Sequence, residues 1–146
     1  MSSEILSSDK VQILDQVDNW KQAIELASQP LLNQGYFKQN YIKAMIASVE
    51  QLGPYIVIAP EIAIAHARPN DDVKKIGLSL LKLNNHINFS EEGHHASLVF
   101  VLSAVDNEGH LEILRNLATI LGNQDTVNQL LKATEVEEII NIIQGE

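Results

Sequence analysis

The pattern of apolar and polar positions along the chain predicts five β-strands. They are expected at residues 10–14, 55–58, 62–65, 75–83 and 97–105. Apolar and polar residues alternate in the first and fourth of these segments, which is typical of half-buried strands. The last segment is almost continuously apolar and rich in β-branched residues, which indicates a strand buried on both faces. The polar residues 84–95 include Gly93 and predict a loop between the last two strands, held by Ile87 and Phe89.

Apolar residues at helical spacing predict five helices. They begin near Asp18 or Asn19, Gln39 or Asn40, Asp106, Asp125 or Thr126, and Thr134, and the first three end at Gly35, Gly53 and Gly122. Pro30 falls inside the first pattern, so that helix is expected to end near Ser28 or to restart there with Pro30 in its first turn. Thr134 and Glu137 have the spacing of a capping box.

The mixture of strands and helices predicts an α/β fold with a mixed, mostly parallel central β-sheet flanked by helices. At 146 residues the chain suits a single domain. Neither a repeat nor a linker divides it, so one domain is expected over residues 1–146. It carries no apolar run of membrane-spanning length and no signal-peptide pattern, so direct membrane insertion is not expected.

Composition narrows the possible functions. The absence of cysteine excludes disulfides, thiolate metal sites and cysteine catalysis, and it fits a cytoplasmic location. The 19 acidic residues outnumber the 10 basic ones and give a net charge of −9. This charge argues against nucleic acid as a partner and favours a partner with a basic face. The alternative interpretation is that the acidity only keeps the protein soluble.

The main candidate for chemistry is His66, within the segment 53–73. It follows a short apolar strand, and ligands gather at strand ends in α/β folds. A neutral imidazole nitrogen can accept a phosphoryl group, and Arg68 can bind the phosphoryl oxygens. The alternative is an ordinary hydrogen-bonded surface histidine.

His110 is the second candidate, because it lies where a buried strand gives way to the N-terminus of a helix. Free backbone N–H groups and the helix dipole favour anions at such a position. A cap-region residue without a special role is the alternative. If His66 and His110 lie side by side at one sheet edge, the two signals reinforce each other.

The other motifs argue against metal or organic cofactors. His86, His94 and His95 lie in the polar segment and are interpreted as solvated. The chain has no histidine pair with zinc spacing, no glycine-rich phosphate loop and no GxSxG nucleophile. Three glutamates near the C-terminus are interpreted as a solvated helix face: Glu135, Glu137 and Glu138.

The segment GPYIVIAPEIAIAHARP, residues 53–69, resembles enzyme IIA components of the bacterial phosphotransferase system (PTS). It is similar to the mannitol/fructose-type superfamily and most similar to its ascorbate-specific branch. The family pattern places Ala59-Pro60 before a short apolar segment, followed by His66-Ala67-Arg68-Pro69. The similarity extends over nearly the whole chain and includes residues 18–27, 73–83 and 103–114.

Two positions depart from the family pattern. Glu61 stands where the family commonly has Gly, and Ala65 stands where it commonly has Pro before the active histidine. A carboxylate at Glu61 would disfavour phosphoryl transfer if it faces the site. In addition, no arginine precedes Arg68, so the upstream active-site arginine of the mannitol branch has no counterpart.

The resemblance implies a phosphotransferase that works through a phosphohistidine and needs no cofactor. His66 would accept the phosphoryl group from the phosphocarrier protein HPr and pass it to a cysteine of a IIB partner. His110 would orient the group and Arg68 would help neutralise it. Together with a membrane IIC component this would serve sugar transport, with ascorbate as the expected substrate. Two alternatives remain: a regulatory binding module without onward transfer, and a protein that kept the fold and lost the chemistry.

Overall fold

The computed structural model describes residues 6–68, 71–90 and 94–144, and these form a five-stranded sheet in the order β1-β4-β5-β3-β2. The strands are β1 (Val11–Leu14), β2 (Val57–Ala59), β3 (Glu61–Ala65), β4 (Gly77–Asn88) and β5 (His95–Ser103). The β1–β4 and β3–β5 pairs are parallel, and the β4–β5 and β2–β3 pairs are antiparallel. The predicted mixed sheet is confirmed, with parallel and antiparallel pairs in equal number rather than mostly parallel.

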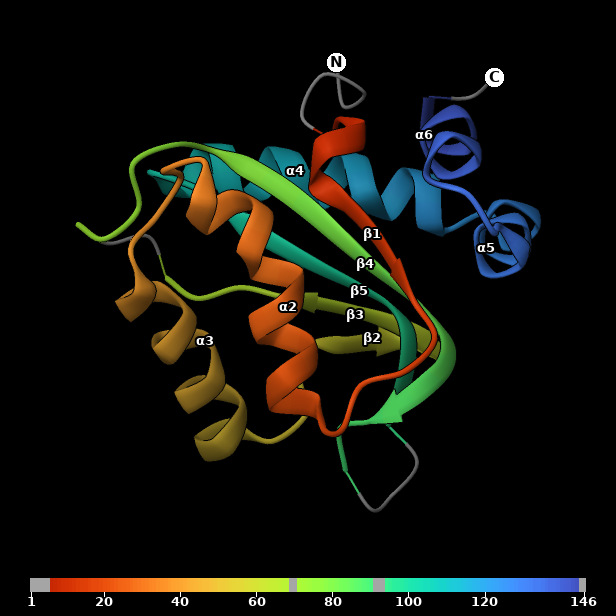
Figure 1. Cartoon of the computed structure of the whole chain (residues 1–146). Coiled ribbons are helices and arrows are strands. Elements are labelled where there is room, and N and C mark those ends of the chain that lie inside the picture. Colours follow the sequence, from red (N-terminus) through yellow and green to blue (C-terminus); the bar gives the residue numbers. More distant parts are fainter. Residues whose placement is uncertain (1–5, 69–70, 91–93, 145–146) are drawn as a thin grey trace.

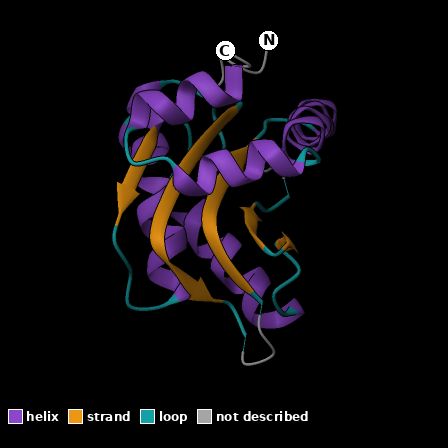
Figure 2. Ribbon diagram, turned by 90° about the vertical axis from the view of Figure 1, so that its right-hand side faces the viewer, coloured by secondary structure: helices purple, strands orange, loops and turns teal. Residues whose placement is uncertain are grey.

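Helices cover both faces of the sheet (Figures 1 and 2). The elements are η1 (Ser8–Lys10), α2 (Trp20–Asn33), α3 (Gln39–Leu52), α4 (Asn107–Leu121), α5 (Gln124–Lys132) and α6 (Val136–Gln144). One core lies between the sheet and α2 and α3, and a second lies between the sheet and α4, α5 and α6. Because side chains alternate along a strand, β3 contributes to both cores. Ala63 and Ala65 pack on the α2–α3 side, whereas Ile62 and Ile64 pack on the α4–α6 side.

Helix α2 continues unbroken through Pro30, so the expected end or restart near Ser28 is wrong. Proline has no backbone N–H, and the carbonyl four residues earlier therefore loses its helical donor. That carbonyl belongs to Leu26, and the Nε2 atom of Gln12 on β1 donates to it at 2.7 Å. A side chain from the neighbouring sheet thus replaces the hydrogen bond that the proline removes.

Most of the described residues of the polar segment predicted as a loop are β-structure. Strand β4 extends to Asn88 and pairs there with His95, which begins β5. The register shifts between Lys82 and Ile87, and residues 84–86 between them are exposed. An irregularity of this kind breaks the apolar–polar alternation while the backbone pairing resumes beyond it. Gly93, predicted as part of the loop, lies outside the described residues.

The other differences are small. Strand β2 begins at Val57, two residues later than predicted, because Tyr55 and Ile56 lie in a turn. Helix α5 is capped by Asn123 rather than by a residue at 125 or 126. Near α6, the backbone N–H and the hydroxyl of Thr134 donate to Glu138 rather than to Glu137. None of the helices in the described ranges is long and apolar enough to cross a membrane.

Candidate active site

His66 directly follows strand β3 and lies at the edge of the sheet where that strand ends. The alternation that places Ile62 and Ile64 on the α4 side places the next alternate residue, His66, on that side as well. Its Nδ1 lies 2.9 Å from the carbonyl oxygen of Ile64. A carbonyl only accepts hydrogen bonds, so Nδ1 carries the proton and donates it. The lone pair of the neutral ring is therefore on Nε2.

His110 lies beside His66 because β5 leads directly into α4. Strands β3 and β5 are parallel neighbours, so their C-terminal ends meet at the same edge of the sheet. Asp106 caps α4 by accepting the N–H of Gly109 at 2.8 Å, which places His110 near the start of the helix. The two imidazole rings have centroids 5.1 Å apart and meet edge to face at 63°. The structure thus brings the two candidate histidines together at one sheet edge, which is the condition under which the two sequence signals reinforce each other.

The two histidines line a hollow of about 200 Å³ together with Ala67, Arg68 and Asn107. The Arg68 side chain is exposed, and within the described part of the chain it makes no hydrogen bond or ion pair. Its guanidinium is therefore available to a ligand with anionic oxygens. Asn107 is the first residue of α4 and was not singled out from the sequence. The only local signal for it was its place in the Asp-Asn-Glu-Gly turn before His110.

The electrostatics of the pair favour a neutral His110. Burial lowers the pKa of His110, and the charge that His66 can carry lowers it further. Both effects act in the same direction because each disfavours the protonated imidazolium. A neutral His110 still has one N–H with which to donate a hydrogen bond to an anion.

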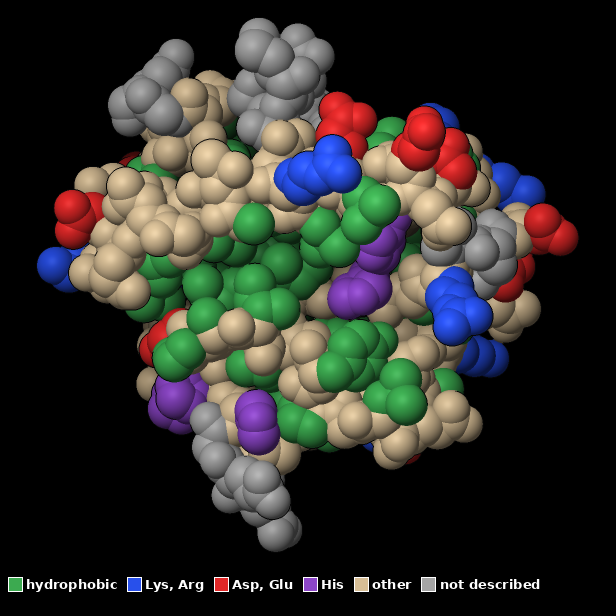
Figure 3. Space-filling view, turned by 180° about the vertical axis from the view of Figure 1, so that it is seen from behind, with side chains coloured by type: hydrophobic (Ala, Val, Ile, Leu, Met, Phe, Trp, Pro, Cys, Tyr) green, Lys and Arg blue, Asp and Glu red, His purple; other side chains and the backbone are tan. Residues whose placement is uncertain are grey.

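Apolar side chains border the hollow. Figure 3 shows two adjoining histidine side chains on a face where hydrophobic side chains are gathered. The exposed apolar residues next to the site in sequence or in space are Tyr55, Ile76, Val105 and Leu111. The Tyr55 ring meets the His66 ring edge-on at 5.7 Å, and its hydroxyl donates to the His66 carbonyl at 3.3 Å. The sequence analysis treated Tyr55 only as the start of a strand.

Glu61 lies at the opposite end of β3 from His66. Five residue steps along the chain, at about 3.3 Å each, put the two positions roughly 16 Å apart. The Glu61 carboxylate accepts a hydrogen bond from Ser97 at 3.3 Å and lies 3.5 Å from Nε2 of His95. It does not face the site. Its φ of +75° lies in the left-handed region that favours glycine, which accounts for the glycine common in the family pattern.

The remaining residues of the motif and the other histidines lie apart from the hollow. Ala65 is buried and pairs with Val101 of β5, and Pro69 lies outside the described residues. His95 begins β5 next to Glu61 and packs against His86 of β4 at a ring distance of 4.7 Å, so both lie on strands rather than in the predicted loop, although His86 is exposed as expected. Across the described ranges no cluster of three or more His, Asp or Glu side chains could hold a metal ion.

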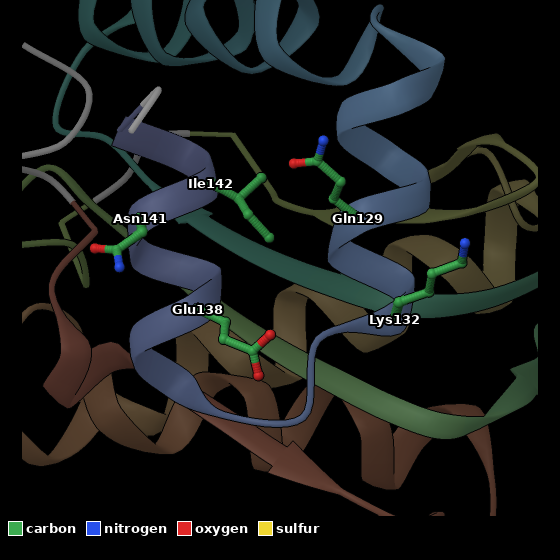
Figure 4. Close-up of a pocket in the computed structure, with 5 residues that line it drawn as sticks. All are labelled: Gln129, Lys132, Glu138, Asn141 and Ile142. Carbon is green, nitrogen blue, oxygen red and sulfur yellow. The ribbon is translucent and has the colours of Figure 1, made fainter.

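A larger hollow of about 410 Å³ lies between α5 and α6. Figure 4 shows Gln129 of α5 and Glu138 and Ile142 of α6 pointing into the space between the two helices. Among the described residues that line it there is no histidine and no arginine. It therefore lacks both the nucleophile and the guanidinium that distinguish the smaller hollow.

Comparison with known proteins identifies the family of the chain. Residues 4–146 match the family described as phosphoenolpyruvate-dependent sugar phosphotransferase system, EIIA 2. The chain belongs to this family. It is thus a IIA component of a sugar phosphotransferase system, with the general role in phosphoryl transfer of such components.

Two relatives of this EIIA 2 chain differ in the sugar that they are named for. The chain is 30% identical over 141 residues to the mannitol-specific cryptic phosphotransferase enzyme IIA component of Escherichia coli K12, covering 97% of the chain and 96% of the relative. It is 25% identical over 145 residues to the ascorbate-specific PTS system EIIA component of Salmonella choleraesuis SC-B67, covering 98% and 94%.

Solved structures confirm the predicted fold class of the EIIA 2 chain. The solution structure of the mannitol-specific cryptic enzyme IIA CmtB from E. coli matches with a TM-score of 0.91 at 29% identity, covering 99% of both chains. A complex of enzyme IIA-Mtl with phosphorylated enzyme IIB-Mtl from E. coli matches with a TM-score of 0.85 at 24% identity, covering 96% and 97%. At this lower identity the likeness concerns the fold alone.

Proposed function

We propose that this EIIA 2 protein, a single domain over residues 1–146, is a phosphoryl carrier that accepts a phosphoryl group from HPr on His66 and passes it to a IIB cysteine. The observation that carries the proposal is the hydrogen bond from Nδ1 of His66 to the Ile64 carbonyl. It holds the ring in the tautomer whose Nε2 has the lone pair, and this ring lines the hollow shared with His110 and Arg68. Nε2 is therefore the proposed nucleophile.

Each transfer step exchanges one bond to phosphorus for another. In the first step the Nε2 lone pair attacks phosphorus while the bond from phosphorus to the donor's nitrogen breaks, and that electron pair stays on the donor. In the second step a IIB thiolate attacks phosphorus, and the electron pair of the broken Nε2–P bond returns to His66. Neither step needs a metal or an organic cofactor, because positioning and charge stabilisation supply most of the catalysis in phosphoryl transfer.

The other residues of the hollow stabilise the transferred group. The Arg68 guanidinium neutralises the phosphoryl oxygens in paired hydrogen bonds. The N–H of neutral His110 donates to one oxygen, and Asn107, at the positive end of the α4 dipole, supplies a further donor. Together with His66, these three side chains belong to two short segments, 66–68 and 107–110, that meet at one sheet edge.

The setting of the site supports transfer between proteins. A hollow with an apolar rim suits successive docking of two partners, and the net charge of −9 is complementary to a donor with a basic face. The related IIA-Mtl forms a complex with phosphorylated IIB-Mtl. Membrane IIC would act only through IIB, and the cytoplasmic location expected from the sequence remains a prediction.

Sugar specificity also remains a prediction. The sequence analysis expected ascorbate, whereas the relatives are named for mannitol and for ascorbate at 30% and 25% identity. Incubating the phosphorylated protein with an ascorbate-type IIB and a mannitol-type IIB, and measuring the rate of transfer to each, decides between them. Faster transfer to the mannitol-type IIB would contradict the ascorbate assignment.

The phosphorylation itself is tested by intact mass spectrometry of the protein incubated with phosphoenolpyruvate, enzyme I and HPr. We expect one acid-labile phosphoryl group that is absent in His66→Ala and present in His86→Ala, a matched control at an exposed histidine on β4. Equal labelling of His66→Ala would overturn the proposal. Labelling without onward transfer to any IIB would favour the regulatory module, and no labelling of the folded protein would favour lost chemistry.

A further inference from the structure

The hydroxyl of Tyr41 lies between the end of β3 and the neighbouring strand β5. Tyr41 belongs to α3, and its side chain is almost completely buried, with 1% of the residue exposed. Its oxygen is 2.8 Å from the carbonyl oxygen of Leu102 and 3.2 Å from the backbone nitrogen of Ala67. One buried hydroxyl therefore contacts the residue after His66 and the strand beside it.

The position of this hydroxyl coincides with the end of the parallel ladder between β3 and β5. The last paired residues are Ala65 and Val101. The next hydrogen bond of the ladder would join the Ala67 N–H to the Leu102 carbonyl, but these two groups do not bond to each other directly. The Tyr41 oxygen lies between these two groups and bonds to both. The chain thus leaves the sheet at His66 while both of these backbone groups keep a hydrogen-bond partner.

The direction of each hydrogen bond follows from the groups involved. A carbonyl only accepts, so the Tyr41 O–H donates to Leu102, and its oxygen accepts the N–H of Ala67. The carbonyl of Ala67, at 3.3 Å, is a second and longer acceptor for the same proton. Burial raises the pKa of Tyr41 to about 12, so the phenol keeps its proton at neutral pH.

We propose that Tyr41 is a positioning residue for phosphoryl transfer, acting through Ala67 to hold His66 in the geometry that the reaction needs. This inference rests on the proposed function of His66. His66 is then held at two points, because its ring bonds back to Ile64 and the backbone of the next residue bonds to Tyr41. A catalytic group that shifts by about 1 Å can lose on the order of a hundredfold in rate.

The test compares Tyr41→Phe with Ser79→Ala. The phenylalanine keeps the ring that packs on Phe37 at 4.9 Å and removes only the hydroxyl. Ser79→Ala also removes a buried hydroxyl, one that donates to the Ala27 carbonyl of α2 at 2.6 Å, away from the site. Comparable thermal stability of the two variants would allow a lost transfer rate to be assigned to position rather than to general destabilisation.

The first readout is the kinetics of phosphoryl transfer from phosphorylated HPr. We expect kcat to fall roughly tenfold to a hundredfold in Tyr41→Phe, with KM for the donor within about twofold because the docking surface is untouched. Ser79→Ala is expected to keep the wild-type kcat. A wild-type kcat in Tyr41→Phe would overturn the inference.

The second readout does not depend on activity. In the wild-type protein the Ala67 amide should exchange with solvent as slowly as the amides of β3, and in Tyr41→Phe it should exchange faster. The ¹⁵N shifts of the His66 ring should show one neutral tautomer in the wild type and a mixture in the variant. Fast exchange of Ala67 in the wild type would overturn the inference even if the variant does not fold.

The two readouts separate failure of this inference from failure of the proposed function. If the wild-type protein accepts no phosphoryl group while a control IIA is labelled in parallel, the proposed function fails. The structural part of the inference is then decided by amide exchange and the ring shifts alone. If the wild type is labelled and Tyr41→Phe is labelled equally fast, only the role of Tyr41 fails.

Discussion

The hydrogen bond from Gln12 to α2 makes a stability prediction that depends on Pro30. In Gln12→Ala, the Leu26 carbonyl loses its side-chain donor, and Pro30 has no N–H with which to replace it. An unsatisfied, partly buried carbonyl costs about 1–3 kcal/mol of unfolding free energy. For a chain of this length, this corresponds to a fall in Tm of roughly 3–9 °C.

The same substitution should cost much less in a Pro30→Ala background. Alanine at position 30 restores the N–H that bonds to Leu26 within the helix, so loss of the Gln12 side chain leaves no orphaned carbonyl. The cost is then about 0.5 kcal/mol, and the coupling between the two positions is about 0.5–2.5 kcal/mol.

The assay is urea unfolding of the four proteins of this double-mutant cycle, followed by the fluorescence of Trp20, the only tryptophan. Gln29→Ala is the control, because the Gln29 side chain donates to an exposed carbonyl one turn earlier in the same helix, that of Glu25. It should cost under about 0.5 kcal/mol in both backgrounds. Equal costs of Gln12→Ala in the wild-type and Pro30→Ala backgrounds would refute the reasoning, because the Leu26 carbonyl would then have another partner.

Three further predictions follow from the site and the sheet. Because burial and the charge of His66 lower the pKa of His110, the unfolded chain binds more protons near its ordinary pKa of 6.5, and stability falls as the pH drops through and below that value. Urea titrations should show a smaller fall for His110→Gln, and an identical pH slope would contradict this. In Gly77→Ala the new Cβ would lie 2.5 Å from the Tyr36 ring, so unfolding free energy should fall by about 1–3 kcal/mol, and an unchanged urea midpoint would count against this packing. Glu61→Gln should change the labelling rate of His66 by less than about twofold, since roughly 16 Å exceeds the Debye length, and a larger change would place Glu61 closer to the site.

Features set by neighbouring residues could be predicted well from the sequence. The cap at Asn19, the start of α4 after Asp106 and the end of α3 at Gly53 depend on local backbone chemistry, and all three are confirmed. The helical continuation through Pro30 could not be predicted, because the donor that permits it is Gln12, on another element. The strand character of residues 84–88 was missed because a register shift disrupts their alternation.

For the candidate site, too, the individual residues could be predicted from the sequence but their arrangement in space could not. His66, Arg68 and His110 were singled out from their places at the ends of expected strands and near a helix start. Their proximity depends on the parallel pairing of β3 with β5, which is not visible in either segment alone. The contacts of Tyr41 could not be predicted from its own segment, since its hydroxyl partners lie 26 and 61 residues away.

The unequal side chains of β3 also fix which way the histidine that follows it, His66, points. A slip of one residue against β5 would turn Ile62 and Ile64 towards α2 and α3, where only the small side chains of Ala63 and Ala65 are accommodated. It would also turn His66 away from α4. The difference in side-chain size between the two faces therefore favours a single register of β3 against β5. A bulky residue at position 63 or 65 would strain this register and would disturb the proposed transfer without altering any side chain that is proposed to contact the phosphoryl group.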